Sequence, residues 1–292
     1  MVVFPNCKVN LGLHITGKRK DGYHNLETIF YPLPWNDVLE ILPLTLQIQQ
    51  AITSSPNTIK ITHQTDDILF VQSGLNIEGD AVHNLCVKAF YLLKQHFPAL
   101  PPVFMYLHKV LPTQAGLGGG SADAAFTLKT IATIFNLSIT DNELEKLALT
   151  LGSDCPFFIQ HQPCIATGRG EQMQPISLNL HHYTWVLINP NIHISTAWAF
   201  AQIKPVETNA SLQHIIQQPI ETWRDTLYND FEKPVYRHFP AIQQIKEALY
   251  NKGALYASLS GSGSTVYGIF PADMQYNFSF PSSYTIKFLQ KK

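Results

Sequence analysis

The stretch Pro112-Thr113-Gln114-Ala115-Gly116-Leu117-Gly118-Gly119-Gly120-Ser121-Ala122 joins two segments of different pattern. Residues 103–108 alternate like a β-strand, whereas residues 124–135 place their apolar side chains on one stripe of a helix. A glycine-rich turn between a strand and a helix offers backbone N–H groups to an anion, because the first turn of a helix has donors without intrahelical partners and carries partial positive charge. This stretch therefore predicts a binding site for the phosphates of a nucleotide.

Individual residues of the loop support this interpretation. Gly118, Gly119 and Gly120 let the backbone approach phosphate oxygens without Cβ clashes and permit positive φ. Ser121 adds a hydroxyl at the helix start that can contact a phosphate or a magnesium ion. The loop is neither a Walker A motif, since no Gly-Lys-Ser/Thr follows, nor G-x-G-x-x-G, since Ser121 replaces the last glycine. The alternative is a flexible turn before a helix, which three consecutive glycines before so strong a helical stripe disfavour.

Length and composition bound the function classes. The chain has 292 residues, more than one hydrophobic core usually organises, which predicts two packed domains. Apolar residues make up 45% and charged residues 14%, as in a folded enzyme. With 20 basic and 21 acidic residues the net charge is −1, so no large basic field attracts nucleic acid or an acidic membrane. An anionic substrate must therefore be held by a local site.

The cysteines are Cys7, Cys86, Cys155 and Cys164, scattered without a C-x-x-C pair or a histidine cluster. This spacing disfavours both a disulfide framework and a zinc site. We expect small buried thiols in a reducing compartment, and no protein metal site.

The N-terminus lacks the pattern of a targeting segment. Lys8 and Asn10 stand where a signal peptide needs an unbroken apolar core. No run of about 18 apolar residues suggests a transmembrane helix. We therefore expect a cytoplasmic protein without a membrane partner.

Periodicity predicts an α+β fold. Residues 8–15 read as a strand with Lys8, Asn10 and His14 on its polar face, followed by a hairpin turn at 17–22. Beyond residue 160, short strands are mixed with helices. We predict an N-terminal domain at 1–160 and a C-terminal α+β domain at 161–292. The other predicted elements are helices at 82–96, at 141–151 after a Thr140/Glu143 capping box, and at 241–250, with strands at 184–188, 254–259 and 265–270.

The glycine-rich stretch resembles the phosphate-binding motif of the GHMP kinases, the superfamily that includes galactose, homoserine and mevalonate kinases. Two further segments match the family in its order, P-N-C-K-V-N-L-G-L-H-I-T-G-K-R-K-D-G-Y-H-N-L-E-T at 5–28 and L-S-G-S-G-S-T-V-Y-G at 259–268. The resemblance spans essentially the whole chain. It implies a two-domain GHMP kinase fold with the active site in the interdomain cleft, ATP held by residues 112–122, and Mg²⁺ accompanying the ATP.

One branch of the family is more similar than the rest. K-x-N-L-x-L followed by G-K-R-x-D-G-Y-H-x-L, together with G-S-D-C-P-F-F at 152–158 and L-Y-N-D-F-E at 227–232, resembles the kinases that act on 4-diphosphocytidyl-2-C-methyl-D-erythritol. The resemblance implies that ATP phosphorylates the 2-hydroxyl of the methylerythritol unit, in isoprenoid precursor biosynthesis. Cys7 and Cys155 depart from the usual alanine and valine, but both are small and apolar.

Two residues are the predicted catalytic groups. Phosphoryl transfer needs a group that orients or deprotonates the attacking hydroxyl. Asp154 follows a glycine-terminated helix and precedes Pro156, and by the resemblance it is the catalytic base. Lys8 corresponds to the family's active-site lysine and is expected to pair with Asp154, which would lower the basicity of the carboxylate. Asp154 is then expected to act chiefly by orienting the hydroxyl. The alternatives are an Asp154 that caps the next turn and a Lys8 that is a solvated edge lysine.

The resemblance also assigns substrate contacts. Tyr23 is expected to stack on cytosine and His24 to form hydrogen bonds with it. A second aromatic platform is expected from residues 194–200, where Phe200 matches the family's position better and Trp198 is physically as good. Either aromatic side chain can instead belong to the core.

Further contacts follow from the same match. Asn10 and Thr196 are expected to contact the methylerythritol unit or its diphosphate. Lys109 and Asn84 are expected to reach the nucleotide. The S-G-S-G-S turn at 260–264 provides two glycines, Gly261 and Gly263, through which a second backbone loop can approach the phosphates.

Two rival functions stay open at this point. One is another GHMP kinase acting on homoserine, mevalonate or a sugar, which the Tyr23-His24 pair and the aromatic segment at 194–200 disfavour. The other is a non-catalytic nucleotide-binding relative, which would not need both Lys8 and Asp154. No feature of the sequence indicates an oligomeric state.

Overall fold

The computed structural model describes residues 1–54, 61–205, 211–272 and 277–290. These residues form two compact units, each assembled from several segments. Unit 1 comprises Met1–Cys7, Asn36–Thr113 and Gly119–His161, and unit 2 comprises Lys8–Trp35, Gln114–Gly118 and Gln162–Lys292.

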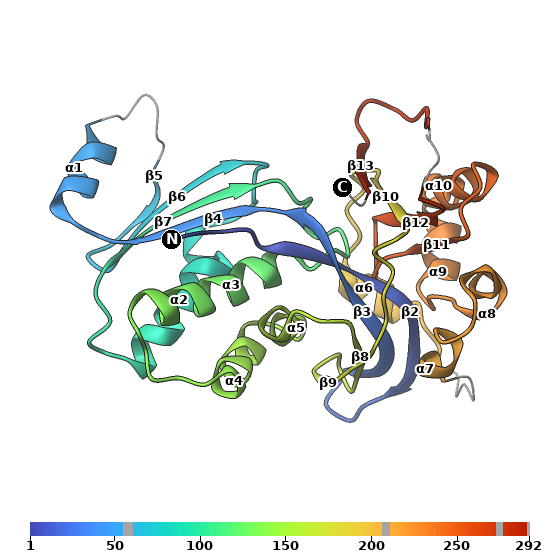
Figure 1. Cartoon of the computed structure of the whole chain (residues 1–292), viewed down its shortest axis with the longest axis horizontal. Coiled ribbons are helices and arrows are strands. Elements are labelled where there is room, and N and C mark those ends of the chain that lie inside the picture. The colour runs from blue at the N-terminus through green and yellow to red at the C-terminus, as the bar shows by residue number, and fades with distance from the viewer. Residues whose placement is uncertain (55–60, 206–210, 273–276, 291–292) are drawn as a thin grey trace. The chain divides into compact units, whose positions relative to one another are not determined.

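Unit 1 combines one mixed sheet with a layer of helices. Its strands are β1 (Val2–Val3), β4 (Val38–Pro43), β5 (Ile61–Gln64), β6 (Ile68–Gly74) and β7 (Val103–Lys109), and its helices are α1 (Leu46–Thr53), α2 (Leu85–His96), α3 (Gly119–Ile134), α4 (Asp141–Leu151) and α5 (Cys155–Gln160), with a short 3-10 helix η1 (Ala81–His83). The strand order is β1-β4-β7-β6-β5, in which β6 and β7 are parallel and α2 lies in the crossover that joins them. Helices α2 and α3 pack together along one face of the sheet (Figure 1).

Local signals of the sequence explain where these helices begin and end. The capping box of α4 is present, because Thr140 N–H donates to Glu143 Oε2 at 2.8 Å and Glu143 N–H donates to Thr140 Oγ1 at 3.3 Å. The helix predicted at 82–96 is shorter than expected. Asn84 Oδ1 accepts the N–H of Cys86 at 2.9 Å and so starts α2 at the next residue, which leaves η1 as a separate turn.

Unit 2 contains two sheets and a group of helices. Its strands are β2 (Asn6–Lys18), β3 (His24–Asn36), β8 (Cys164–Thr167), β9 (Gln172–Pro175), β10 (Thr184–Asn189), β11 (Tyr256–Leu259), β12 (Val266–Phe270) and β13 (Thr285–Leu289), and its helices are α6 (Thr196–Ala201), α7 (Leu212–Ile215), α8 (Trp223–Thr226), α9 (Glu232–His238) and α10 (Pro240–Asn251), with a 3-10 helix η2 (Ile220–Thr222). The sheet orders are β2-β3-β8-β9 and β11-β12-β10-β13. Helix α10 packs on α9, β11 and β12 (Figure 1), so the predicted strands and helix of this region are confirmed.

The grouping of residues differs from the predicted division into 1–160 and 161–292. The last junction, between His161 and Gln162, lies beside the predicted boundary, but residues 8–35 belong with the C-terminal part of the chain. Strand β3 pairs with β8, with Ile29 opposite Ile165, and Leu13 of β2 joins the core that includes α10 and β12. Strand pairing over such a sequence separation leaves no local period that could have predicted it.

The buried residue His14 of β2 makes the stability of the fold sensitive to acid. The side chain is 1% exposed, its ring stacks on Tyr228 with centroids 4.3 Å apart, and neither ring nitrogen has a hydrogen-bond partner in the described part of the chain. Burial lowers the pKa of His14 below its ordinary value of 6.5, although the charges of Asp230 and Glu27 oppose this shift.

We therefore expect the protein to lose stability as the pH falls below about 6.5, because the unfolded chain then binds a proton that the folded His14 does not. The measurement is urea unfolding at pH 7.5, 6.5 and 5.5 for the wild type and His14→Phe, which keeps an aromatic ring beside Tyr228. The free energy of unfolding should fall less steeply with acid in the variant. Parallel pH dependences in the two proteins would contradict the assignment.

Candidate active site

Helix α3 begins inside the glycine run, at Gly119. A Cβ on Gly119 would lie 3.1 Å from Lys109 Nζ and 3.2 Å from Leu111 Cβ, so glycine lets the helix start close against the end of β7. Gly120 is exposed, and a Cβ there would meet nothing nearer than Leu85 at 3.6 Å. The first N–H groups of α3 have no intrahelical partners, as predicted for an anion-binding helix start.

Positive φ occurs in the first part of the loop. The values are +51° at Gln114, +78° at Gly116 and +69° at Gly118, all in unit 2. Of the three consecutive glycines, Gly118 uses the positive φ that glycine permits, whereas Gly119 and Gly120 are helical. Those two glycines are needed for close approach and for an open helix start rather than for a left-handed backbone.

The first part of the loop is bound to the S-G-S-G-S turn within unit 2. Ser260 Oγ donates to the carbonyl of Gly116 at 2.8 Å, and the N–H of Thr265 donates to the carbonyl of Ala115 at 3.2 Å. A Cβ on Gly116 would collide with the Ser260 carbonyl oxygen. The two glycine-rich segments predicted to bind phosphate therefore lie in contact.

Lys8 is enclosed beside this loop. Its side chain is 3% exposed, its ammonium group lies 4.7 Å from the centroid of the Phe30 ring, and it donates to Asn10 Oδ1 at 2.6 Å. Its backbone N–H donates to the Leu117 carbonyl at 2.9 Å. The alternative of a solvated edge lysine is wrong, because this ammonium group is held in the interior next to the predicted phosphate loop.

Asn10 binds protein groups at both ends of its side chain. Besides accepting from Lys8, it donates from Nδ2 to Thr28 Oγ1 at 2.9 Å, and Thr28 in turn donates to the Gly12 carbonyl at 2.5 Å. The residue is 2% exposed. The bond to Lys8 supports a role in positioning the ammonium group, and the predicted contact of Asn10 with the substrate stays a prediction.

Asp154 immediately precedes α5 and is half-buried. Its side chain makes no capping hydrogen bond to the fully described helix α5, so the alternative of a helix cap is not realised. A Cβ on Gly152 would lie 3.9 Å from Ser121 Oγ and 3.3 Å from Cys155 Sγ. The turn that carries Asp154 is therefore packed against the first turn of α3, within unit 1. Lys8 belongs to unit 2, and its pairing with Asp154 stays a prediction.

The thiol of Cys155 lies beside Ser121 and is not reactive. It is buried, and burial raises its pKa to about 12, while a hydrogen bond with Ser121 opposes the rise. A neutral thiol of this kind is a poor nucleophile. The sensitivity to thiol reagents that an exposed Cys155 would cause is therefore not expected.

The predicted contact between Lys109 and the nucleotide does not agree with the structure. Its ammonium group is buried and donates to Asp37 Oδ2 at 2.5 Å and to Asp123 Oδ2 at 2.7 Å. Burial by itself would lower the pKa of Lys109, but the two carboxylates outweigh it and the pKa is raised. Asp37 also accepts the N–H groups of Val110 and Leu111 at 2.6 and 2.8 Å. Lys109, Asp37 and Asp123 form a buried triad that supports the backbone before the glycine-rich loop. The triad leaves no exposed part of the ammonium group to contact a nucleotide.

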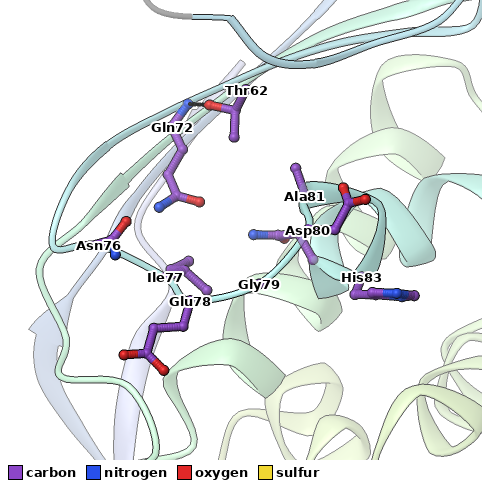
Figure 2. A pocket seen from close by; sticks show the side chains of 10 residues that line it. Thr62, Gln72, Asn76, Ile77, Glu78, Gly79, Asp80, Ala81 and His83 are labelled. Carbon is purple, nitrogen blue, oxygen red and sulfur yellow. Dashed lines mark hydrogen bonds between the residues drawn. The ribbon is translucent and has the colours of Figure 1, made fainter.

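Asn84 lines a polar cavity of about 280 Å³ in unit 1. Its walls are Thr62 and Gln72 together with residues 76–81, 83 and 84. Figure 2 shows Gln72 extending from β6 toward the loop, with Asn76 on one side of the cavity and Asp80 on the other. The N–H of Gln72 donates to Thr62 Oγ1 at 3.0 Å. Asn84 therefore has two roles in this place, as the cap of α2 and as part of a cavity that sequence reasoning did not find.

The predicted cytosine platform lies on the β2–β3 hairpin. Tyr23 is 55% exposed, and the guanidinium carbon of Arg169 lies 4.8 Å from its ring centroid. Thr196 is exposed, and its Oγ1 lies 3.3 Å from the hydroxyl oxygen of Ser262 in the S-G-S-G-S turn. Arg169 was not identified from the sequence, because a single arginine between two glycines carries no periodic signal.

The structure separates the two aromatic candidates of segment 194–200. The Phe200 ring stacks on His24 with centroids 5.0 Å apart and an interplanar angle of 18°. Trp198 instead packs on His238 and Phe239 at centroid distances of 4.9 and 5.6 Å. Both aromatics also pack against the core that includes Phe231, and the stack on His24 favours Phe200 as the cytosine platform, which stays a prediction.

Comparison with known proteins agrees with this geometry. The family description "GHMP kinases N terminal domain" matches residues 84–162, and "GHMP kinases C terminal" matches residues 211–276. A protein of Bacteroides fragilis named 4-diphosphocytidyl-2-C-methyl-D-erythritol kinase is 49% identical over 270 residues, which are 92% of each chain. The chain belongs to the GHMP kinase family. It is therefore an ATP-dependent kinase, and the predicted α+β GHMP kinase fold is confirmed.

Other GHMP kinases extend the comparison. A protein of the same name from Parabacteroides distasonis is 43% identical over 270 residues, again 92% of each chain. The crystal structure of a 4-(cytidine 5'-diphospho)-2C-methyl-D-erythritol kinase superposes with a TM-score of 0.75 at 27% identity, over 92% of this chain and 90% of the other. The Methanococcus jannaschii mevalonate kinase, with a TM-score of 0.62 at 14% identity over 92% and 90% of the two chains, shares the fold.

Two absences apply to the described residues of the chain. They contain no group of three or more His, Cys, Asp or Glu side chains that would hold a metal ion. Among the same residues, no helix is both long and apolar enough to cross a membrane.

Proposed function

We propose that this GHMP kinase transfers the γ-phosphoryl group of ATP to the 2-hydroxyl of 4-diphosphocytidyl-2-C-methyl-D-erythritol, giving the 2-phosphate and ADP. The observation that carries the proposal is the stack of His24, the neighbour of Tyr23, on Phe200 from a distant part of the chain. Stacked rings suit a flat base, which mevalonate and homoserine lack. The names of the relatives that are 43–49% identical support the same acceptor.

The phosphates of ATP are assigned to the glycine-rich loop. The open first turn of α3 provides N–H donors and partial positive charge, and the loop backbone at 114–118 follows the tight course that Gly116 and Gly118 permit. The cavity beside Asn84, in the same unit as α3, offers amide groups to the base of the nucleotide. Mg²⁺, bound with ATP, would neutralise phosphate charge, and the hydroxyl of Ser121 in the first turn of α3 would be an oxygen donor to it.

The acceptor hydroxyl is assigned to Lys8 and Asp154. Lys8, held by Asn10 next to the Leu117 carbonyl, supplies positive charge to the transferring phosphoryl group. Asp154, in the turn that packs beside Ser121, orients the hydroxyl and accepts its proton. The location of these groups in one interdomain cleft stays a prediction.

Recognition of the cytidine group is assigned to the aromatic residues. Burial lowers the pKa of His24, as does the charge of Lys18, so its imidazole is neutral near pH 7 and both donates and accepts hydrogen bonds. Binding would replace the His24–Phe200 stack with a cytosine–Phe200 stack and leave His24 to bond the edge of the base. Tyr23 provides the second platform.

The test is a phosphate-transfer assay that offers the cytidylyl substrate, mevalonate and homoserine to the same enzyme. We expect ADP release only with the cytidylyl compound, and a product phosphorylated at the 2-hydroxyl. Equal turnover of the small alcohols, or no turnover of the cytidylyl compound, would refute the proposed acceptor.

A further inference from the structure

The β8–β9 turn has a rigid local structure that presents one arginine. Gly168 and Gly170 adopt φ values of +70° and +103° on either side of Arg169. The N–H of Arg169 donates to Glu171 Oε2 at 2.5 Å, and its Nε lies 3.8 Å from Glu171 Oε1. The N–H of Leu26 donates to the Gly168 carbonyl at 2.7 Å, which fixes the turn to β3 three residues after Tyr23. The direction of the arginine side chain is therefore set by the backbone and by its acidic neighbour.

Arg169 covers one face of the Tyr23 ring. The guanidinium carbon lies 4.8 Å from the ring centroid, within the range of a cation–π contact. The backbone of Tyr23 is held as well, because its N–H donates to Asp21 Oδ1 at 3.1 Å and Asp21 pairs with Arg19 at 2.9 Å. Tyr23 is 55% exposed and so stays accessible to a ligand.

We propose that Arg169 is a positioning residue for substrate specificity, which holds the Tyr23 ring in the orientation that stacks on the cytosine of the acceptor. The proposal rests on the proposed function and extends it to a residue outside the segments quoted for the resemblance. An exposed aromatic ring on a hairpin otherwise samples several rotamers, and ordering it on binding would cost affinity. Guanidinium groups stack on aromatic faces better than ammonium groups do, which makes arginine suited to this place.

The experiment compares Arg169→Gln with a matched control. Arg224 lies over the Tyr250 ring at 4.4 Å, in the same unit but in the packing of α8 and α10, and Arg224→Gln removes an equivalent contact there. Arg169→Gln should raise the KM for the cytidylyl substrate roughly three- to tenfold, with kcat and the KM for ATP unchanged. Arg224→Gln should leave all three constants unchanged, and Arg169→Lys should fall between wild type and Arg169→Gln.

A double-mutant cycle with Tyr23→Leu shows whether Arg169 acts through the ring. In the Tyr23→Leu background, Arg169→Gln should have no further effect on KM. An equal further rise would overturn the proposal, because Arg169 would then contact the substrate itself. An unchanged KM in Arg169→Gln alone would overturn it too.

A calorimetric titration with cytidine 5'-diphosphate gives a readout that is independent of turnover. The Kd should rise for Arg169→Gln and Arg169→Lys and not for Arg224→Gln, and thermal unfolding shows that each variant is folded. If Arg169→Gln does not fold, the Kd of Arg169→Lys for cytidine 5'-diphosphate tests the proposal instead. Failure of the proposed function is distinguishable, since the wild-type enzyme would then not turn over the cytidylyl compound at all.

Discussion

The variant Asp154→Asn is expected to lose about 10²–10⁴-fold in kcat while its KM for ATP stays close to that of the wild type. Asparagine keeps the size and the hydrogen-bonding oxygen of Asp154 but cannot take up a proton or carry negative charge. The fold should tolerate the change, because the two side chains have nearly the same size and shape and Asp154 is only half-buried. Steady-state kinetics with the cytidylyl substrate, and ATP affinity by titration, measure the two parts of this expectation.

The matched control is Asp141→Asn. Asp141 is the first residue of α4 and is exposed, so it shares the helix-start setting of Asp154 without lying beside Ser121. It should keep wild-type kcat. A wild-type kcat in Asp154→Asn would show that the catalytic role is wrong, and an equal loss in both variants would show that the assay reports the stability of unit 1.

The variant Lys109→Met is expected to destabilise the protein by about 3–5 kcal/mol, since it leaves two buried carboxylates without their counter-ion. Asp37 and Asp123 are almost fully enclosed, and burial together with the charge of Asp37 already raises the pKa of Asp123, although Lys109 opposes the rise. Without Lys109 the carboxyl group of Asp123 takes up a proton more readily in the folded state than in the unfolded state. The loss of stability should therefore be smaller at pH 6 than at pH 8.

Urea unfolding of Lys109→Met and Lys94→Met measures this contrast. Lys94 pairs with Asp67 at 2.7 Å in a more exposed setting, with exposed side-chain fractions of 26% and 36%, and its removal should cost less, under about 1 kcal/mol for the ion pair. Equal losses of unfolding free energy in the two variants would contradict the larger effect expected from breaking the buried triad of Lys109, Asp37 and Asp123. A loss that grows as the pH falls would contradict the proposed charge state.

Much of the local structure was predictable from the sequence because its causes are local. The capping box at Thr140, the stop at Gly152 and the alternation of β7 each depend on residues a few positions apart. The loop before α3 and the candidates Lys8 and Asp154 were identified by the same kind of short motif.

What the sequence could not give depends on distant partners. Lys109 looked like a nucleotide ligand until the structure placed Asp37, 72 positions earlier, at its ammonium group. Phe200 and Trp198 were equivalent as isolated aromatics, and their difference lies in whether His24 or His238 is the neighbour. The role of Arg169 depends on Tyr23 in the same way. Side-chain identity suggests a chemistry, but the packing of remote segments decides whether the group can use it.

The bond from Ser260 to Gly116 spans 144 positions of the chain and has a consequence for biosynthesis. Residues 114–118 are held by Lys8 near the start of the chain and by Ser260 and Thr265 near its end. A growing polypeptide therefore makes the helix start of α3 long before the partners that shape the preceding turn exist. The phosphate loop can reach its final form only after residue 265 has been synthesised, so a chain released early would carry the motif without the finished nucleotide cradle.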